Sequence, residues 1–226
     1  LTEINTSAQS SGTDYSLRFQ ACKDFKAYYL HVKTISDTLT SAMQSQAPRC
    51  TTYTTGGSLY TYCTYTLNLR IKAGEQIGTV SGPGAFDFGA TDYRIAPLPF
   101  ANPSRHLSDQ LYTACPLDYY SADVKGSLYA KVGRYDGGQT RTTAPVCGEI
   151  MQDVGGTAQG DWYLPGSPDS PEDPHLALVK YSIDPSWSAF SVGNSVSGLT
   201  GVHYFSPKSS GKVLTAFSQV TADGNT

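Results

Sequence analysis

The sequence predicts a mainly β protein, in which an antiparallel, barrel-like sheet domain is followed by a short helical linker and a second, smaller β domain. Short runs such as residues 15–19 and 67–71 alternate apolar and polar side chains, which is the pattern of a half-buried strand. The composition suits strands and turns, with 16 Tyr and 22 Gly among 226 residues. These features place the domains at residues 1–105 and 140–226, with the linker at 106–139.

The first domain is expected to contain strands, one short helix and one hairpin. Residues 1–13 are polar and rich in Ser and Thr, so we expect a loose arm or an edge strand there. A hairpin is expected between Cys50 and Cys63, and a small antiparallel meander is expected around the turn at Gly74. The remaining elements expected here are strands at 15–19, 25–32, 67–71, 76–80 and 86–90 and a helix at 36–43.

The linker carries the best helical patterns of the chain, at residues 109–115 and 121–132. The second begins at a plausible capping residue, Ser121, and stops at Gly133. After it the sequence returns to short apolar runs separated by turn residues, which predicts a second sheet. Its strands are expected at 146–151, 160–164, 176–181, 188–192, 202–205 and 213–220.

The five cysteines indicate at least one disulfide. Cys50 and Cys63 lie at the ends of equal arms on either side of Gly56-Gly57, so a hairpin would place their sulfurs opposite each other. Such a pair is typical of an oxidising compartment and favours an extracellular or cell-surface protein. The pairing of Cys22, Cys115 and Cys147 stays open, and so does the alternative of five reduced cysteines in the cytosol.

Charge and hydropathy exclude several classes of partner at the level of sequence. Charged residues make up 15% of the chain and its net charge is −3, so we expect no nucleic-acid partner, which would call for clustered Lys and Arg. No apolar run approaches the roughly 20 residues that a membrane-spanning helix needs, so we expect no membrane span.

Three short segments carry a family resemblance. Residues 72–82 read KAGEQIGTVSG, residues 86–92 read FDFGATD, and the upstream residues 27–32 read AYYLHV. In this order they resemble the K-x-G-x-x-I-G…H-x-H-F-G and Y-x-H-L signatures of the lysostaphin-type zinc endopeptidases, which cleave peptidoglycan peptides. The resemblance covers about residues 15–105 and implies a degenerate lysostaphin-type domain in a bacterial secreted protein.

The same resemblance implies that the zinc chemistry is lost. A zinc hydrolase needs three protein ligands and an open position for water. His31 matches the Y-x-H-L histidine, but Ala85 and Asp87 stand where the family has the two histidines of H-x-H, and residues 1–30 contain no His for the upstream ligand pair. The resemblance therefore predicts a pseudoenzyme without a cofactor, in which His31 and Asp87 are vestigial catalytic or weak metal-binding candidates.

His31 and Asp87 also have structural interpretations. His31 can be a remnant that is hydrogen-bonded within the sheet. Asp87 can be satisfied by local backbone amides or by His31, because a lone Asp–His pair is short of the usual zinc ligand count.

Clustered tyrosines suggest a binding surface. Alternation along the strands would place several rings on one solvent-facing side, where flat rings could stack on a saccharide or a peptide. The alternative is that tyrosine serves there as an ordinary cross-strand residue. The candidates are Tyr28, Tyr53, Tyr60 and Tyr62.

Three functions follow as hypotheses. The first is a non-catalytic secreted or cell-surface protein that binds cell-wall glycan or peptide through the former catalytic groove. The second is an active zinc metallohydrolase whose missing ligands lie outside this chain. The third is a subunit of an extracellular filament or surface assembly that pairs with copies of itself, for example through an edge at residues 1–13.

Overall fold

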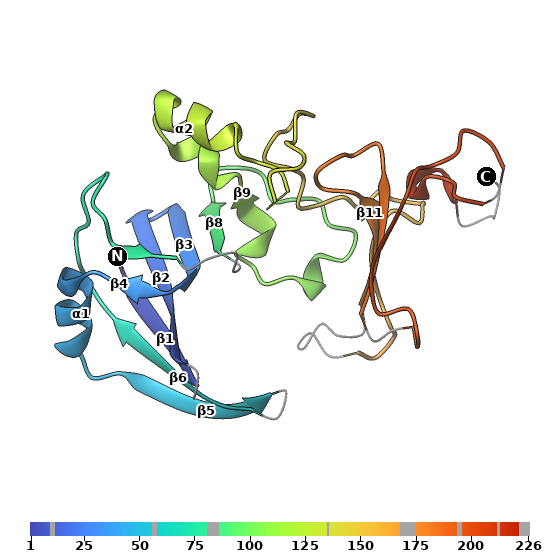
Figure 1. The fold of residues 1–226 in the computed structure, drawn as a ribbon. Coiled ribbons are helices and arrows are strands. Elements are labelled where there is room, and N and C mark those ends of the chain that lie inside the picture. The colour runs from blue at the N-terminus through green and yellow to red at the C-terminus, as the bar shows by residue number, and fades with distance from the viewer. Residues whose placement is uncertain are drawn as a thin grey trace. The chain divides into compact units, whose positions relative to one another are not determined.

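The structure is a computed structural model and describes residues 1–9, 12–55, 58–80, 86–134, 136–167, 175–193, 196–211 and 213–221. It is mainly β, with antiparallel sheets, as the sequence predicts (Figure 1). The chain divides into two compact units. Unit 1 comprises Leu1–Ala96 and Thr113–Pro116, and unit 2 comprises Pro97–Tyr112 and Leu117–Thr226.

Unit 1 is built on a seven-stranded antiparallel sheet with the order β5-β6-β1-β2-β3-β8-β9. The sheet is open, with β5 and β9 at its edges, so the expected barrel-like closure does not occur among the described strands. A separate two-stranded pairing joins β4 (Thr34–Ile35) to β7 (Gly78–Thr79). The strands of the large sheet are β1 (Glu3–Gln9), β2 (Gly12–Cys22), β3 (Phe25–Val32), β5 (Arg49–Thr55), β6 (Ser58–Thr66), β8 (Asp87–Asp92) and β9 (Thr113–Ala114).

One face of this sheet forms the hydrophobic core of unit 1. Helix α1 (Asp37–Gln44) packs on that face, and Leu39 contributes a fully buried side chain to it (Figure 1). Ser36 caps the helix by accepting a hydrogen bond from the Leu39 amide. The other buried members of the cluster are Leu1, Ile4, Leu17 and Val32.

The expectation that residues 1–13 form a loose arm or a free edge is wrong. β1 pairs with β2 on one side and with β6 on the other, so it is an interior strand with no free edge. Ile4 is the one large apolar residue of β1, and its side chain is 0% exposed, so it anchors a strand that otherwise reads as polar. The proposed edge for self-assembly at residues 1–13 is therefore absent.

Two other segments of unit 1 differ from expectation because the backbone finds different partners. Residues 67–71 form no strand, although their alternating apolar side chains do pack against the core. Their amides bond instead to the chain start, where Leu67 N donates to Thr2 O at 2.8 Å. Residues 109–115 form no α-helix, because Thr113 and Ala114 pair with β8. Of the strand expected at 76–80, only Gly78–Thr79 forms a strand, β7. The strand expected at 86–90 is present as β8, at Asp87–Asp92.

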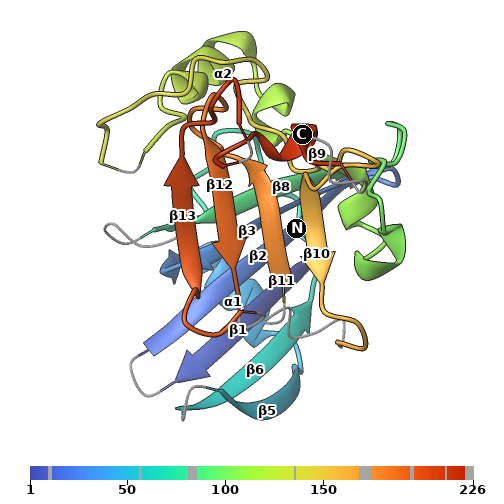
Figure 2. The same ribbon diagram turned by 90° about the vertical axis from the view of Figure 1, so that its right-hand side faces the viewer.

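Unit 2 holds a four-stranded antiparallel sheet, whose strands lie side by side in the order β10-β11-β12-β13 (Figure 2). These are β10 (Gly160–Tyr163), β11 (His175–Lys180), β12 (Ser188–Val192) and β13 (Gly201–Phe205), and they confirm four of the expected strands. Helix α2 (Ala122–Tyr129) lies within the helix expected at 121–132. The short 3-10 helices of the chain are Pro103–Arg105, Gln110–Tyr112, Pro116–Tyr119 and Phe217–Gln219.

Two expected strands of unit 2 do not form. At 146–151 the chain turns, since the amide of Gly148 donates to Pro145 O at 2.9 Å and Gly148 adopts a φ of 84°. At 213–220 the backbone leaves the extended region at Leu214, which has a φ of 61°, and then forms a 3-10 turn. In both places local turn geometry prevails over β propensity.

Candidate functional site

His31 lies at a bulge between β2 and β3. Two residues of β3, Leu30 and His31, oppose the single residue Ser16 of β2. His31 adopts a φ of 62°, in the left-handed region that non-glycine residues rarely occupy. The bulge therefore turns the imidazole toward its neighbours on β2 and β8.

The imidazole of His31 lies between two carboxylates. Its Nδ1 lies 3.0 Å from Asp14 Oδ2, and because a carboxylate only accepts, Nδ1–H donates this hydrogen bond. Its Nε2 lies 3.8 Å from Asp87 Oδ2 on β8. The three side chains are 41–58% exposed, so the cluster is open to ligands. The structure thus brings together the two sequence candidates, His31 and Asp87, and adds Asp14.

The two ring nitrogens of His31 face different carboxylates, and this limits the metal ligands that the cluster can supply. Asp14 accepts the hydrogen bond from Nδ1–H. Among the described residues, Nε2 and the Asp87 carboxylate are then the two groups left to share a metal ion, whereas zinc sites use three or four ligands from the protein. No group of three or more His, Cys, Asp or Glu side chains within the described residues is arranged to hold a metal ion. Ala85, at the position of the other family histidine, lies outside those residues.

Aromatic packing on the opposite face holds β3 beside β8. Tyr29 pairs with Phe88 across the strands, and their ring centroids are 5.6 Å apart. Phe86 stacks on Tyr29 with centroids 5.7 Å apart and an interplanar angle of 17°. These contacts fix the register Leu30↔Asp87, which keeps Asp87 next to His31.

The strand registers place all four predicted tyrosines on the face that carries Asp14 and Arg18. Tyr62 lies across from Ser7, which in turn pairs with Asp14, and Tyr53 pairs with Tyr60 on the adjacent hairpin. Tyr28 pairs with Arg18 on β2. We call this the polar face, and its members are Glu3, Asp14, Arg18, Tyr28, His31, Tyr53, Tyr60, Tyr62 and Asp87.

The tyrosines of the polar face differ in their surroundings. Tyr53 and Tyr60 stack with centroids 5.3 Å apart and an interplanar angle of 7°, and Tyr53 is 45% exposed. Burial raises the pKa of the Tyr62 hydroxyl, and the Arg18 guanidinium opposes part of that shift. The Tyr28 ring lies over Gly89, where any Cβ would approach its Cζ to 2.4 Å. Gly89 therefore provides the space for this ring beside Asp87.

The charged members of the polar face other than His31 and Asp87 were missed from the sequence. Arg18 Nε lies 3.3 Å from Glu3 Oε1, and Asp14 orients His31. Alternation along residues 15–19 could have placed Asp14 and Arg18 on one face, opposite the buried Leu17. Their partners on other strands could not be assigned without the sheet order.

The predicted disulfide between Cys50 and Cys63 forms, and the two residues are directly paired across the β5–β6 hairpin. The turn residues Gly56 and Gly57 lie outside the described part of the chain. Cys115 and Cys147 are disulfide-bonded as well, and Cys22 is free and exposed.

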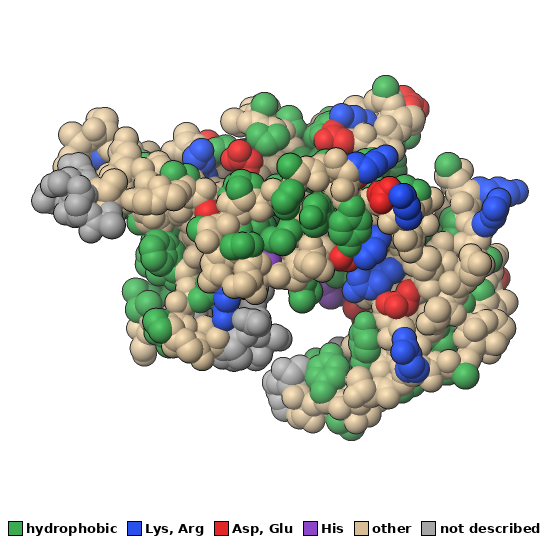
Figure 3. Space-filling model, turned by 180° about the vertical axis from the view of Figure 1, so that it is seen from behind, with side chains coloured by type: hydrophobic (Ala, Val, Ile, Leu, Met, Phe, Trp, Pro, Cys, Tyr) green, Lys and Arg blue, Asp and Glu red, His purple; other side chains and the backbone are tan. Residues whose placement is uncertain are grey.

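Several charged side chains of the described surface form local ion pairs. Lys125 Nζ lies 2.5 Å from Asp118 Oδ1, and hydrogen bonds from Lys125 and Tyr129 lower the pKa of the Asp118 carboxyl. On the side shown in Figure 3, Lys and Arg side chains lie among Asp and Glu side chains. None of the described helices has the length and apolar character needed to cross a membrane.

Comparison of the chain with known proteins finds no matching family, no matching curated protein and no matching solved structure. The resemblance to lysostaphin-type endopeptidases therefore rests on its motif residues, among them His31, Asp87 and Gly89.

Proposed function

We propose that the protein is a non-catalytic, extracellular binding protein whose unit 1 is a lysostaphin-type scaffold without zinc chemistry. Its polar face would bind the peptide component of the bacterial cell wall. The observation that carries the proposal is the geometry of His31, whose Nε2 shares its space with one carboxylate, that of Asp87, while Asp14 occupies Nδ1.

The position of the motif residues supports this scaffold. Because the resemblance assigns histidines of both the Y-x-H-L and H-x-H-F-G motifs to one site, the two segments would have to lie close together. Here the corresponding strands, β3 and β8, are neighbours in the sheet and bring His31 within 3.8 Å of Asp87. The resemblance implies that Asp87 replaces a ligand histidine and that Ala85 replaces a histidine that assists catalysis, while β3 and β8 remain paired.

The chemistry of the polar face suits an elongated peptide. Asp14 and Asp87 accept hydrogen bonds from amides or ammonium groups, Arg18 donates to carboxylates, and the stacked Tyr53–Tyr60 pair offers a flat apolar surface. The face crosses from β5 to β8, which is five strand spacings or about 24 Å at 4.8 Å each. An extended peptide of about seven residues would span it at roughly 3.4 Å per residue.

An extracellular location is supported by the cysteines. Four of the five are disulfide-bonded, namely the Cys50–Cys63 pair and Cys115 and Cys147. Disulfides persist in secreted and surface proteins and are rare in the reducing cytosol.

Binding of a soluble peptidoglycan fragment tests the proposal. Tyr53→Ala and Asp87→Ala remove contacts at the two ends of the polar face, and each is expected to weaken binding about fivefold to tenfold, since each deletes an exposed contact worth about 1 kcal/mol. Affinity is measured by calorimetric titration of the full chain.

Thr54→Ala is the matched control, because Thr54 is exposed on the same strand as Tyr53 and points to the other side of the sheet. It is expected to bind as tightly as the unsubstituted protein. Unchanged affinity in both Tyr53→Ala and Asp87→Ala, or no binding by the unsubstituted protein, would rule out the polar face as the binding surface.

A further inference from the structure

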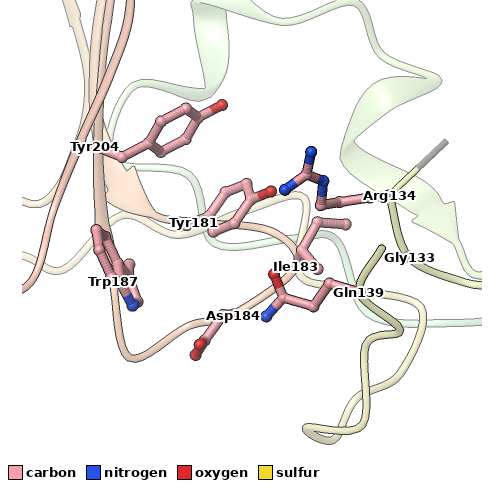
Figure 4. Close-up of a pocket in the computed structure, with 8 residues that line it drawn as sticks. All are labelled: Gly133, Arg134, Gln139, Tyr181, Ile183, Asp184, Trp187 and Tyr204. Atoms are coloured by element: carbon pink, nitrogen blue, oxygen red, sulfur yellow. The ribbon is translucent and has the colours of Figure 1, made fainter. Parts of the chain in front are cut away.

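Unit 2 contains an open cleft of about 790 Å³ that no sequence motif indicates. Its lining comes from three parts of the chain that are distant in the sequence: a hairpin that contributes residues 133, 134 and 139, the β11–β12 connection at 181–187, and β13 (Figure 4). The volume is near the upper end of the range for small-molecule sites, about 300–1,000 Å³. The cleft therefore has room for an oligomeric ligand.

One wall of the cleft is aromatic. The rings of Tyr181 and Tyr204 pack with centroids 4.6 Å apart at an angle of 59°. Trp187 and Tyr204 remain 43% and 51% exposed, so much of their ring surface faces solvent. Exposed aromatic rings that are held in place offer area for stacking at a low cost in conformational entropy.

A tight turn fixes the position of Trp187. Its amide donates to Asp184 O at 3.0 Å, and the Asp184 carboxylate accepts from both the amide and the hydroxyl of Ser186. These hydrogen bonds also lower the pKa of the Asp184 carboxyl, so it remains an ionised acceptor at the edge of the cleft. Pro185 lies at the second position of this turn, where its restricted φ is favourable.

The opposite wall is polar. Figure 4 shows the Arg134 guanidinium near the hydroxyl of Tyr181, with Gln139 across the cleft from Trp187. The hairpin that presents both residues is closed by a hydrogen bond of 2.8 Å from the Arg134 amide to Gln139 O. Gly133 is required at its base, since a Cβ there would meet Gln139 O at 2.2 Å.

A buried arginine joins the two walls. Arg141 is 4% exposed, and its guanidinium donates to the carbonyl of Ser182 beside the aromatic wall. Its own amide donates to Val132 O at 2.7 Å, at the base of the polar hairpin. The two walls are thus connected by hydrogen bonds before any ligand arrives, which lowers the entropic cost of binding.

We propose that this cleft is a binding site for a neutral oligosaccharide. Trp187 and Tyr204 would stack on the apolar C–H faces of the sugar rings, while Arg134, Gln139 and Asp184 would exchange hydrogen bonds with the hydroxyls. A sugar hydroxyl both donates and accepts. The cleft provides donors at Arg134 and both donors and acceptors at Gln139 on the polar wall, and acceptors at Asp184 beside Trp187. This site is separate from the polar face of unit 1 and does not depend on it.

The charges of the cleft favour a neutral ligand. Arg134 Nη2 lies 2.6 Å from Asp136 Oδ2, so the one basic side chain among the described lining residues is already paired with a carboxylate. Asp184 adds a negative charge, which disfavours anionic sugars. Proline-rich peptides also bind aromatic grooves, but they lack the array of hydroxyls that three polar side chains would match.

Intrinsic fluorescence and calorimetry can test this site, because the chain has only two tryptophans, Trp162 and Trp187. The full-length protein is titrated with trisaccharides of glucose, mannose and N-acetylglucosamine, and with a proline-rich peptide. We expect at least one trisaccharide to bind and to change the emission of a Trp162→Phe variant, in which Trp187 is the sole reporter.

Trp187→Ala and Tyr204→Ala are each expected to weaken trisaccharide binding at least about tenfold, as loss of a central aromatic contact does. Trp162→Ala is the matched control, since Trp162 is similarly exposed on β10 and does not line this cleft. Thermal unfolding confirms that each variant is folded. Failure of all three trisaccharides to bind, binding of the proline-rich peptide alone, or an equal loss in Trp162→Ala would overturn the proposal.

Discussion

Replacing Leu39 with alanine is expected to lower the free energy of unfolding of unit 1 by about 2–5 kcal/mol, the usual cost of removing a large side chain from a packed core. Leu39 is 0% exposed, and it belongs to the same buried cluster as Ile4 and Leu17. The substitution leaves a cavity between α1 and the sheet. Because a typical domain is stable by only about 5–15 kcal/mol, the loss is a large fraction of the total.

Hydrogen exchange monitored by mass spectrometry measures this effect best, because it reports on β1 and β2 directly, whereas both tryptophans lie in unit 2. Leu59→Ala is the matched control, with the same chemical change at a side chain that is 64% exposed on β6. Its expected cost is within about 0.5 kcal/mol. Equal protection of β1 amides in the two variants would contradict the packing described for α1.

Replacing both Cys50 and Cys63 with serine is expected to destabilise unit 1 by about 3 kcal/mol, the loop-closure contribution of a disulfide with this separation. The sequence separation of the pair is 13 residues. The disulfide also closes the β5–β6 hairpin, in which Tyr53 and Tyr60 pair nearer the turn and form the stacked end of the polar face. We therefore expect faster hydrogen exchange in β5 and weaker binding of the peptidoglycan fragment.

Cys22→Ser controls for the change of cysteine to serine, because Cys22 is free and exposed. It should leave both stability and binding within error of the unsubstituted protein. The account of the hairpin would be contradicted if the double serine variant unfolded at the same denaturant concentration as Cys22→Ser.

Local patterns predicted the elements that depend on local geometry. The equal arms around Gly56-Gly57 were enough to predict the Cys50–Cys63 pair. Clean alternation was enough for β2, and short apolar runs bounded by turn residues were enough for β11 and β12. β1 was mistaken for a loose arm or an edge strand because most of its residues are polar. Its burial comes from two neighbouring strands that local sequence does not reveal. Residues 109–115 were mistaken for a helix because pairing with β8 overrides local propensity.

The candidate sites also separate into features that local sequence can predict and features that depend on long-range contacts. His31 and Asp87 could be selected as candidates because each lies in a segment with a family resemblance. Alternation places Tyr60 and Tyr62 on one face of β6, whereas Tyr28 joins them only through the sheet order. Asp14 was missed because its contact with His31 depends on a bulge between β2 and β3. The cleft of unit 2 was missed altogether, since Arg134, Trp187 and Tyr204 come from three segments that only the fold brings together.

The central claim is that unit 1 binds without a metal, and elemental analysis of the natively purified protein tests it most directly. The sample is prepared without chelators and without added zinc. We expect far less than one zinc per chain, because His31 Nε2 and Asp87 supply two ligands where zinc sites need at least three from the protein. About one zinc per chain, together with hydrolysis of a peptidoglycan peptide, would contradict the account and indicate an active metallohydrolase.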